Sequence, residues 1–129
     1  MADTDKKKIL VVEDDFFIRD LYEKQLQLSG FLVVGASDGE QGVEKTKQEK
    51  PDLVLLDIML PKIGGYELCR MLKHDATCRD IPIILVSAID QKIDTDLGKT
   101  VGADDYFTKP FEPTVLLAKI KELTKNHAK

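Results

Sequence analysis

Acidic side chains directly follow two of the apolar runs in the sequence. Glu13, Asp14 and Asp15 come straight after one run, and Asp57 comes straight after another. An acid in such a place is often only the N-cap of the next helix, and we expect that role for Asp15. Acids that crowd together repel one another and raise each other's pKa unless a cation lies among them. Oxygen ligands suit Mg²⁺, with Mn²⁺ as the alternative, so the pattern predicts a divalent cation site.

Two further polar residues complete a set that suits phosphoryl transfer. Ser87 follows a third apolar run and Lys109 a shorter one; singly, they would pass for a turn residue and a surface lysine. A carboxylate beside a metal ion either ligates it or attacks phosphorus and becomes an acyl phosphate. The metal, the hydroxyl and the ammonium group could then each take one oxygen of a phosphoryl group on Asp57. No glycine-rich loop of Walker or Rossmann type occurs, so a nucleotide does not fit.

A parallel sheet would bring these residues together. Five apolar runs rich in β-branched residues, at 9–12, 31–34, 53–56, 81–86 and 106–107, alternate with segments of helical spacing. Continuous runs are typical of strands covered on both faces. Asp38 is a predicted N-cap and Gly30 a predicted helix end. The sequence therefore predicts an α/β fold, a doubly wound (βα)5 domain, which binds ligands at the carboxyl ends of its strands.

Three apolar stripes are expected to pack the helices on the sheet, because residues three or four positions apart share a helix face. The stripes comprise Phe17, Leu21 and Leu28 in the first helix, Leu68, Met71 and Leu72 in a middle helix, and Leu116, Ile120 and Leu123 in the last.

Composition narrows the class of protein. A chain of 129 residues with 43% hydrophobic and 33% charged residues is the size and balance of one folded domain. The net charge of −4 and the pI of about 5.2 argue against a nucleic-acid binder. The polar N-terminus lacks a signal-peptide core and no apolar stretch could span a membrane, so we expect a cytoplasmic protein. Cys69 and Cys78 are expected to be reduced.

Four segments together resemble the receiver domain of bacterial two-component response regulators, in particular the stand-alone receivers of the chemotaxis type. They are Val11–Asp15, Leu55–Pro61, Ile84–Ala88 and Gly102–Phe111. The resemblance extends from about Lys8 to Leu123, which we take as the core of a single receiver domain spanning residues 1–129. It implies a flavodoxin-like fold with a five-stranded parallel sheet in the order 2-1-3-4-5 and helices on both faces.

The resemblance also assigns the acidic residues. It implies that Asp57 is the phosphoacceptor and that Glu13 and Asp14 hold Mg²⁺ with it. The backbone carbonyl of Met59 is implied as a further ligand. Glu13 stands where many family members have aspartate, which puts only its direct contact with the metal in question.

The remaining site residues are assigned in the same way. Ser87, which replaces the more frequent threonine, and Lys109 are implied to contact the phosphoryl oxygens. Tyr106 matches the switch aromatic of the family, which moves inward when Ser87 moves toward the phosphate; otherwise it is a strand aromatic packed on a helix. Phe107 would face the opposite side of the sheet. The Lys109–Pro110 bond is expected to be cis by resemblance.

The implied phosphodonor is a sensor histidine kinase or a phosphotransfer protein. From Glu112 onward the sequence holds four lysines and two glutamates, which we interpret as a solvated helix face. The receiver would then either relay the phosphoryl group to another protein or bind a target when phosphorylated. That target would be a partner protein, or a second copy in a phosphorylation-dependent homodimer, docked on the fourth helix, fifth strand and fifth helix. We expect no nucleic-acid or membrane partner.

Other functions remain open at this stage. A haloacid-dehalogenase-like phosphatase would use an aspartate two residues after Asp57 as general acid, and that residue is Met59. A metal- or FMN-binding module of similar fold would not need Lys109. The chain could also be a receiver cut from a longer response regulator or hybrid kinase, against which its Met1 start argues mildly. We therefore expect a signalling phosphoacceptor rather than an enzyme, limited to self-directed phosphoryl transfer and autodephosphorylation.

Overall fold

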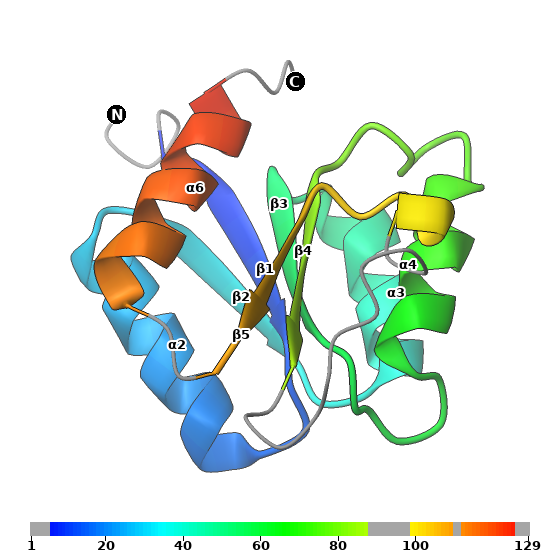
Figure 1. Ribbon diagram of the computed structural model, residues 1–129, viewed down its shortest axis with the longest axis horizontal. Coiled ribbons are helices and arrows are strands. Elements are labelled where there is room, and N and C mark those ends of the chain that lie inside the picture. The colour runs from blue at the N-terminus through cyan, green and yellow to red at the C-terminus, as the bar shows by residue number, and fades with distance from the viewer. Residues whose placement is uncertain (1–5, 88–98, 110–111, 126–129) are drawn as a thin grey trace.

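Five strands form one parallel sheet at the centre of the molecule (Figure 1). The computed structural model describes residues 6–87, 99–109 and 112–125. The strands lie in the order β2-β1-β3-β4-β5, and every pairing is parallel. This order confirms the predicted flavodoxin-like fold. The strands are β1 (Lys8–Val12), β2 (Leu32–Ala36), β3 (Leu53–Asp57), β4 (Ile83–Ser87) and β5 (Asp105–Thr108).

Helices cover both faces of this sheet. On one face lie α2 (Phe16–Leu28) and α6 (Pro113–Lys125), and on the other lie α3 (Gly39–Glu49) and α4 (Gly65–Lys73) (Figure 1). A further helical turn at residues 99–101 precedes β5. Because both faces are covered, the strands need no polar side, which explains the continuous apolar runs of the sequence.

Side chains of each strand alternate between two apolar layers, because successive strand residues point to opposite faces. In β1, Leu10 and Val12 pack toward α3 and α4, whereas Ile9 and Val11 pack toward α2 and α6. All of these side chains are at most 1% exposed. The polar residues that follow the strands are thus held on a rigid, fully packed frame.

The helix ends follow the sequence signals. The side chain of Asp38 accepts a hydrogen bond from the backbone N–H of Gln41 at 2.8 Å and caps α3. Gly30, which follows the end of α2, has a φ of +97°, a conformation that favours glycine. Both predictions are confirmed.

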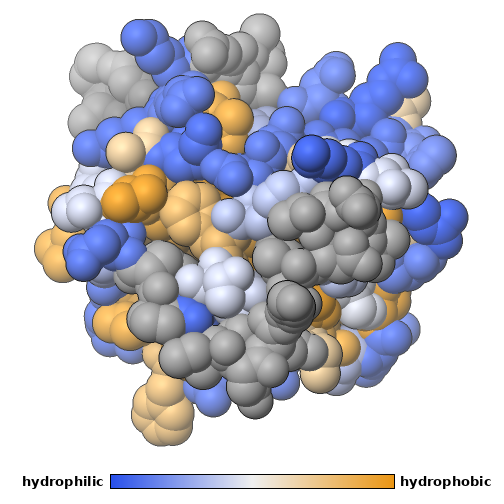
Figure 2. All heavy atoms as spheres, in the orientation of Figure 1, coloured by the Kyte–Doolittle hydropathy of each residue, from blue (hydrophilic) through white to orange (hydrophobic). Residues whose placement is uncertain are grey.

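The predicted apolar stripe of the first helix is wrong. Phe17, Leu21 and Leu28 are 80%, 56% and 89% exposed, whereas Tyr22 and Leu26 of α2 are buried. Both sets have helical spacing, so periodicity alone could not choose between them. In Figure 2 apolar atoms reach the surface on the side where α2 and α6 lie in Figure 1.

The other two stripes are largely confirmed. Leu68 and Leu72 of α4 are buried, and so are Leu116 and Ile120 of α6. Leu123 is partly buried in the layer shared with α2. Met71 departs from the prediction, with 39% of its surface exposed at the margin of the α4 contact.

Both cysteines are free and buried, as the sequence predicts. Among the residues that the structure describes, none of the helices combines the length and the apolar character needed to cross a membrane.

Replacing Ile120 by alanine should destabilise the fold strongly. Ile120 is 0% exposed between α6 and the sheet, so the variant leaves a cavity and loses about 2–5 kcal/mol of unfolding free energy. Val115→Ala, on the same helix but with Val115 54% exposed, is the matched control and should change the free energy by only about 0.5 kcal/mol. Urea denaturation measures both; equal losses would contradict this packing.

Candidate functional site

The carboxyl ends of β1 and β3 bring three acidic side chains together. Val12 and Leu56 are partners in the sheet, so Glu13 and Asp57, which follow them, stand at the same edge. Asp14 extends from the next position of the chain. One carboxylate oxygen of each acid lies within 4.8 Å of the other two. Glu13, Asp14 and Asp57 thus form the acidic cluster that the sequence predicts.

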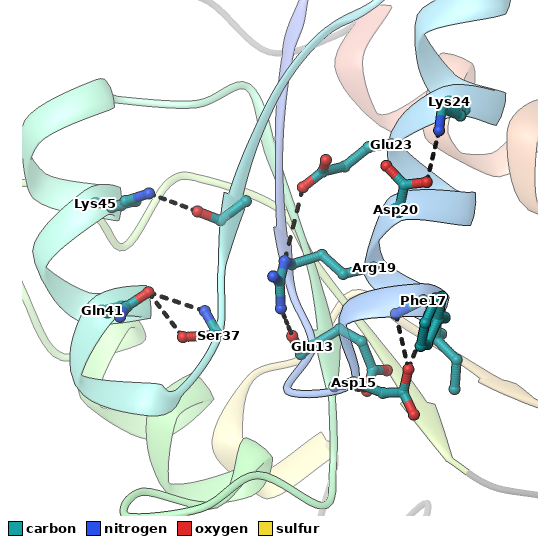
Figure 3. A network of polar contacts seen from close by, with 12 residues as sticks. Glu13, Asp15, Phe17, Arg19, Asp20, Glu23, Lys24, Ser37, Gln41 and Lys45 are labelled. Carbon is teal, nitrogen blue, oxygen red and sulfur yellow. Dashed lines mark hydrogen bonds and ion pairs between the residues drawn. The ribbon is translucent and has the colours of Figure 1, made fainter.

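Asp15 stands apart from this cluster and caps α2. Its Oδ1 accepts hydrogen bonds from the backbone N–H groups of Phe17 at 2.9 Å and Ile18 at 3.1 Å (Figure 3). This is the N-cap role predicted for Asp15. The carboxylate is occupied with the first turn of the helix, so the acidic cluster is limited to the other three acids.

Backbone hydrogen bonds hold the acidic cluster in place. The N–H of Glu13 donates to the carbonyl of Ala36 at 3.0 Å and continues the β1–β2 pairing past the end of β1. Oε2 of Glu13 accepts from the N–H of Asp15 at 3.1 Å. Oδ1 of Asp57 accepts from the N–H of Met59 at 3.2 Å. The carboxylates are therefore oriented by the chain itself before any ligand is bound.

Lys109 reaches the acidic cluster from the end of β5. Its Nζ lies 3.9 Å from Oε1 of Glu13 and 5.8 Å from the centre of the Tyr22 ring. The backbone N–H of Lys109 donates to the carbonyl of Ser87 at 3.0 Å, which anchors the residue beside the neighbouring strand. The positively charged ammonium group of Lys109 therefore lies at the edge of the acidic cluster, as predicted.

Ser87 ends β4 with its side chain fully buried. Its Oγ donates a hydrogen bond to Oγ1 of Thr108 at 3.3 Å. The hydroxyl is thus present at the predicted edge but is engaged with the neighbouring strand. Thr108 is a partner that the sequence analysis did not identify.

The two aromatic residues of β5 face opposite sides of the sheet. Tyr106 packs against the layer of α3 and α4, and Phe107 packs against the layer of α2 and α6. This confirms the predicted orientation. Pro110, and with it the expected cis peptide bond, lies outside the described residues.

Burial makes the charge of Glu13 costly. The side chain is only about 4% exposed, and burial, opposed by the hydrogen bond from the Asp15 backbone, raises its pKa to about 8. The negative charge of Asp57 adds to this shift, and the nearby Lys109 reduces it. Burial therefore favours the protonated form of Glu13 when no metal is bound, and a cation among the carboxylates would favour the ionised form.

The ligand set of the acidic cluster suits a hard divalent cation. Three carboxylates from adjacent loops supply oxygen atoms only, and Asp14 and Asp57 keep part of their surface open to water. Mg²⁺ binds through a few carboxylates and retains several water molecules. Softer transition metals favour histidine or cysteine, and the acidic cluster contains neither.

Comparison with known proteins identifies the family. The sequence profile of the response regulator receiver domain matches residues 9–121. The chain belongs to this family. Receiver domains are signalling domains of two-component systems rather than classical enzymes, and they interact with histidine kinases or phosphotransfer proteins. The dehalogenase-like reading is therefore set aside.

Curated relatives of this receiver are transcriptional regulators. The chain is 45% identical over 117 residues to the alkaline phosphatase synthesis transcriptional regulatory protein PhoP of Bacillus subtilis, covering 91% of this chain and 48% of that protein. It is 40% identical over 116 residues to the DNA-binding dual master transcriptional regulator RpaA of a Synechocystis species, covering 90% and 48%. The chain thus spans about half the length of these relatives.

Solved receiver structures superimpose closely. The BeF3-activated N-terminal receiver domain of RstA from Klebsiella pneumoniae has a TM-score of 0.82 and 37% identity, covering 92% of this receiver and 99% of that chain. The receiver domain of the sensor histidine kinase PA1611 from Pseudomonas aeruginosa has a TM-score of 0.85 and 28% identity, covering 94% and 99%. In that structure a magnesium ion is coordinated in the active site cleft.

Two residues of helix α2 near the site were not singled out from the sequence. Tyr22 lies under Lys109, and Nη1 of Arg19 donates to the backbone carbonyl of Glu13 at 2.8 Å. The apolar stripe predicted for the first helix did not include Tyr22. For Arg19, only the position one turn after the acidic residues could have served as a signal.

Replacing Glu13 by glutamine should change how stability depends on pH. An acid whose pKa is higher in the folded state destabilises the fold as pH rises, here from its ordinary 4.5 to about 8. The melting temperature of metal-free wild-type protein should therefore fall over this range, and that of Glu13→Gln should fall less. Melting curves in chelator from pH 5 to 8 measure this.

Glu67→Gln is the control for the pH experiment, because Glu67 lies on the exposed face of α4 and pairs with Arg70. It should follow the wild-type pH profile. Identical profiles for wild type and Glu13→Gln would show that Glu13 is not the group that titrates.

Proposed function

We propose that this receiver accepts a phosphoryl group on Asp57 from a sensor histidine kinase or phosphotransfer protein, in a reaction that requires Mg²⁺. The observation that carries the proposal is the acidic cluster, with Asp57 at the end of β3 and Lys109 Nζ 3.9 Å from Glu13. The magnesium ion in the PA1611 receiver supports the choice of metal.

Each residue then has a role in phosphoryl transfer. A carboxylate oxygen of Asp57 attacks the phosphorus, and the bond from phosphorus to the donor histidine nitrogen breaks, leaving its electron pair on the imidazole. Glu13, Asp14, Asp57 and the backbone carbonyl of Met59 would hold Mg²⁺, which neutralises charge on the phosphoryl oxygens. Lys109 offsets the charge of another oxygen.

Phosphorylation would be sensed through Ser87. Its hydroxyl donates to Thr108 in the present state, at the long distance of 3.3 Å. A phosphoryl oxygen on Asp57 is a stronger acceptor, so Ser87 would exchange partners. Tyr106, on the same strand as Thr108, would then move inward and change the surface of β5.

The changed surface would be read by a protein partner. The proposed docking face comprises β5, α6 and the fourth helix expected from the resemblance. Of the segment before β5, the described residues 99–101 form a helical turn, and residues 88–98 lie outside the described part of the chain. Lys119 of α6 lies 3.6 Å from Asp105 of β5, so charged groups of the two elements meet there. The same face could serve a phosphorylation-dependent homodimer.

The receiver could also act within a longer response regulator. The relatives PhoP and RpaA are transcriptional regulators about twice as long as this chain. In such a protein DNA binding would belong to another domain, and the absence of a nucleic-acid partner remains a prediction for the receiver alone. The site chemistry is the same in either case.

Asp57→Asn should abolish phosphorylation, because the amide is a poor nucleophile. Intact mass after incubation with acetyl phosphate should show one added phosphoryl group in wild type with Mg²⁺ and none with chelator. The control is Asp20→Asn, since Asp20 is an exposed acid of α2 that pairs with Lys24; it should be phosphorylated normally. Equal phosphorylation of Asp57→Asn would place the phosphoacceptor elsewhere.

Lys109→Ala should separate phosphate binding from the conformational response. Loss of a cation beside the acidic cluster should leave Mg²⁺ binding intact or tighten it slightly. NMR shifts of β5 on adding beryllofluoride should become small in this variant. Lys24→Ala, which removes an exposed lysine of α2, should respond as wild type does. A wild-type response of Lys109→Ala would exclude this role for the lysine.

A further inference from the structure

We propose that Arg19 is a positioning residue that holds the backbone of Glu13 so that the acidic cluster binds Mg²⁺. The inference rests on the proposed function, because it concerns how tightly the acidic cluster binds that metal. Arg19 itself touches neither the proposed metal nor the phosphoryl group and would act through Glu13.

The guanidinium of Arg19 contacts three neighbours, of which Figure 3 shows Glu13 and Glu23. Nη1 donates to the carbonyl oxygen of Glu13 at 2.8 Å. Nε lies 3.9 Å from Oε2 of Glu23, one turn further along α2. The ring of Phe16 lies under the guanidinium, 5.6 Å from its central carbon. With only 18% of its side chain exposed, Arg19 has little freedom to leave this position.

The hydrogen bond from Arg19 fixes the backbone carbonyl group of Glu13. The N–H of Glu13 is already bonded to the carbonyl of Ala36 at 3.0 Å. The carbonyl of Glu13 points the other way, to Arg19. Both backbone polar groups of Glu13 are thus hydrogen-bonded, one to β2 and one to α2, which restricts rotation of the backbone that carries the side chain. Mutation of groups that hold metal ligands in place without touching the metal commonly weakens metal binding about 10–100-fold.

Gly35 of β2 leaves the space that the arrangement needs. A Cβ atom at Gly35 would collide with Oε2 of Glu23 and lie 3.2 Å from Cδ of Arg19. The carbonyl of Gly35 accepts a hydrogen bond from Nζ of Lys45 at 2.6 Å, which holds the strand from the opposite side (Figure 3). A larger residue would push the Glu23 and Arg19 side chains outward and draw Nη1 away from Glu13.

Charge and position predict opposite effects for Arg19. As a cation near the acidic cluster, Arg19 repels Mg²⁺, so its removal should tighten binding if charge is all that matters. As a positioning residue, its removal should weaken binding. The sign of the change in Mg²⁺ affinity therefore separates the two roles.

The test is titration of the unphosphorylated protein with MgCl₂ by calorimetry. Arg19→Met removes the donor and the charge but keeps an unbranched chain, and we expect its dissociation constant to rise about tenfold. Gly35→Ala changes no charge and should also raise the dissociation constant, because the added methyl group displaces the Glu23 and Arg19 side chains. The variant should still fold, because the colliding Glu23 carboxylate is the flexible end of a side chain. Amide exchange at residues 13–15 without metal should become faster in both variants.

Arg70→Met is the matched control, because Arg70 is an exposed arginine that pairs with Glu67 on α4. It should bind Mg²⁺ as wild type does. Should Arg19→Met fail to fold, Arg19→Lys, which keeps the charge but lacks the guanidinium geometry, and Gly35→Ala carry the test.

The outcomes distinguish this inference from the proposed function. If wild type binds Mg²⁺ and the Arg19 variants bind it equally or more tightly, the positioning role is overturned and the proposed function stands. If wild type fails to bind Mg²⁺, the proposed function itself fails. Weaker binding in Arg19→Met and Gly35→Ala, with faster amide exchange and an unchanged control, supports the role of Arg19.

Discussion

The burial of the Glu13 carboxylate beside Asp57 is the constraint on which the site depends. Glu13 is almost fully buried, with carboxylate oxygens of Asp14 and Asp57 within 4.8 Å, so its negative charge is costly mainly because it is removed from water. Hydrogen bonds from the Asp15 and Met59 backbones and the charge of Lys109 offset only part of this cost. The carboxylates are thus already held together by the fold before a cation binds, so a cation would not have to bring its ligands together.

The sheet makes that arrangement possible because it is rigid on both faces. Its strands pack between α2 and α6 on one side and α3 and α4 on the other, so their carboxyl ends are fixed relative to one another. The same frame connects the site to the surface. Ser87 bonds to Thr108 of β5, a strand that also carries Tyr106 and is part of the proposed docking face. A change at Asp57 that moved Ser87 would therefore reach β5 through the Ser87–Thr108 hydrogen bond.

Helix α2 supports the site through side chains that contact site residues directly. It packs on the sheet through Tyr22 and Leu26 and places Arg19 and Tyr22 beside the site, against Glu13 and Lys109 respectively. Ile18 is partly buried beside them, whereas the other apolar residues of α2 stay exposed: Phe16, Phe17, Leu21 and Leu28. The first helix therefore supports both the acidic end of β1 and the lysine at the end of β5.

The sequence by itself determined the parallel sheet and the members of the acidic cluster. Continuous apolar runs require cover on two faces, and in a parallel sheet the polar residues that follow them must share one edge. It did not determine which side of α2 is buried, because Phe17 and Tyr22 both fit a helical period. Nor did it determine that Arg19 meets the carbonyl of Glu13, or that Ser87 pairs with Thr108. Those contacts depend on how a helix lies across two strands and on the strand neighbours, and only tertiary packing decides both.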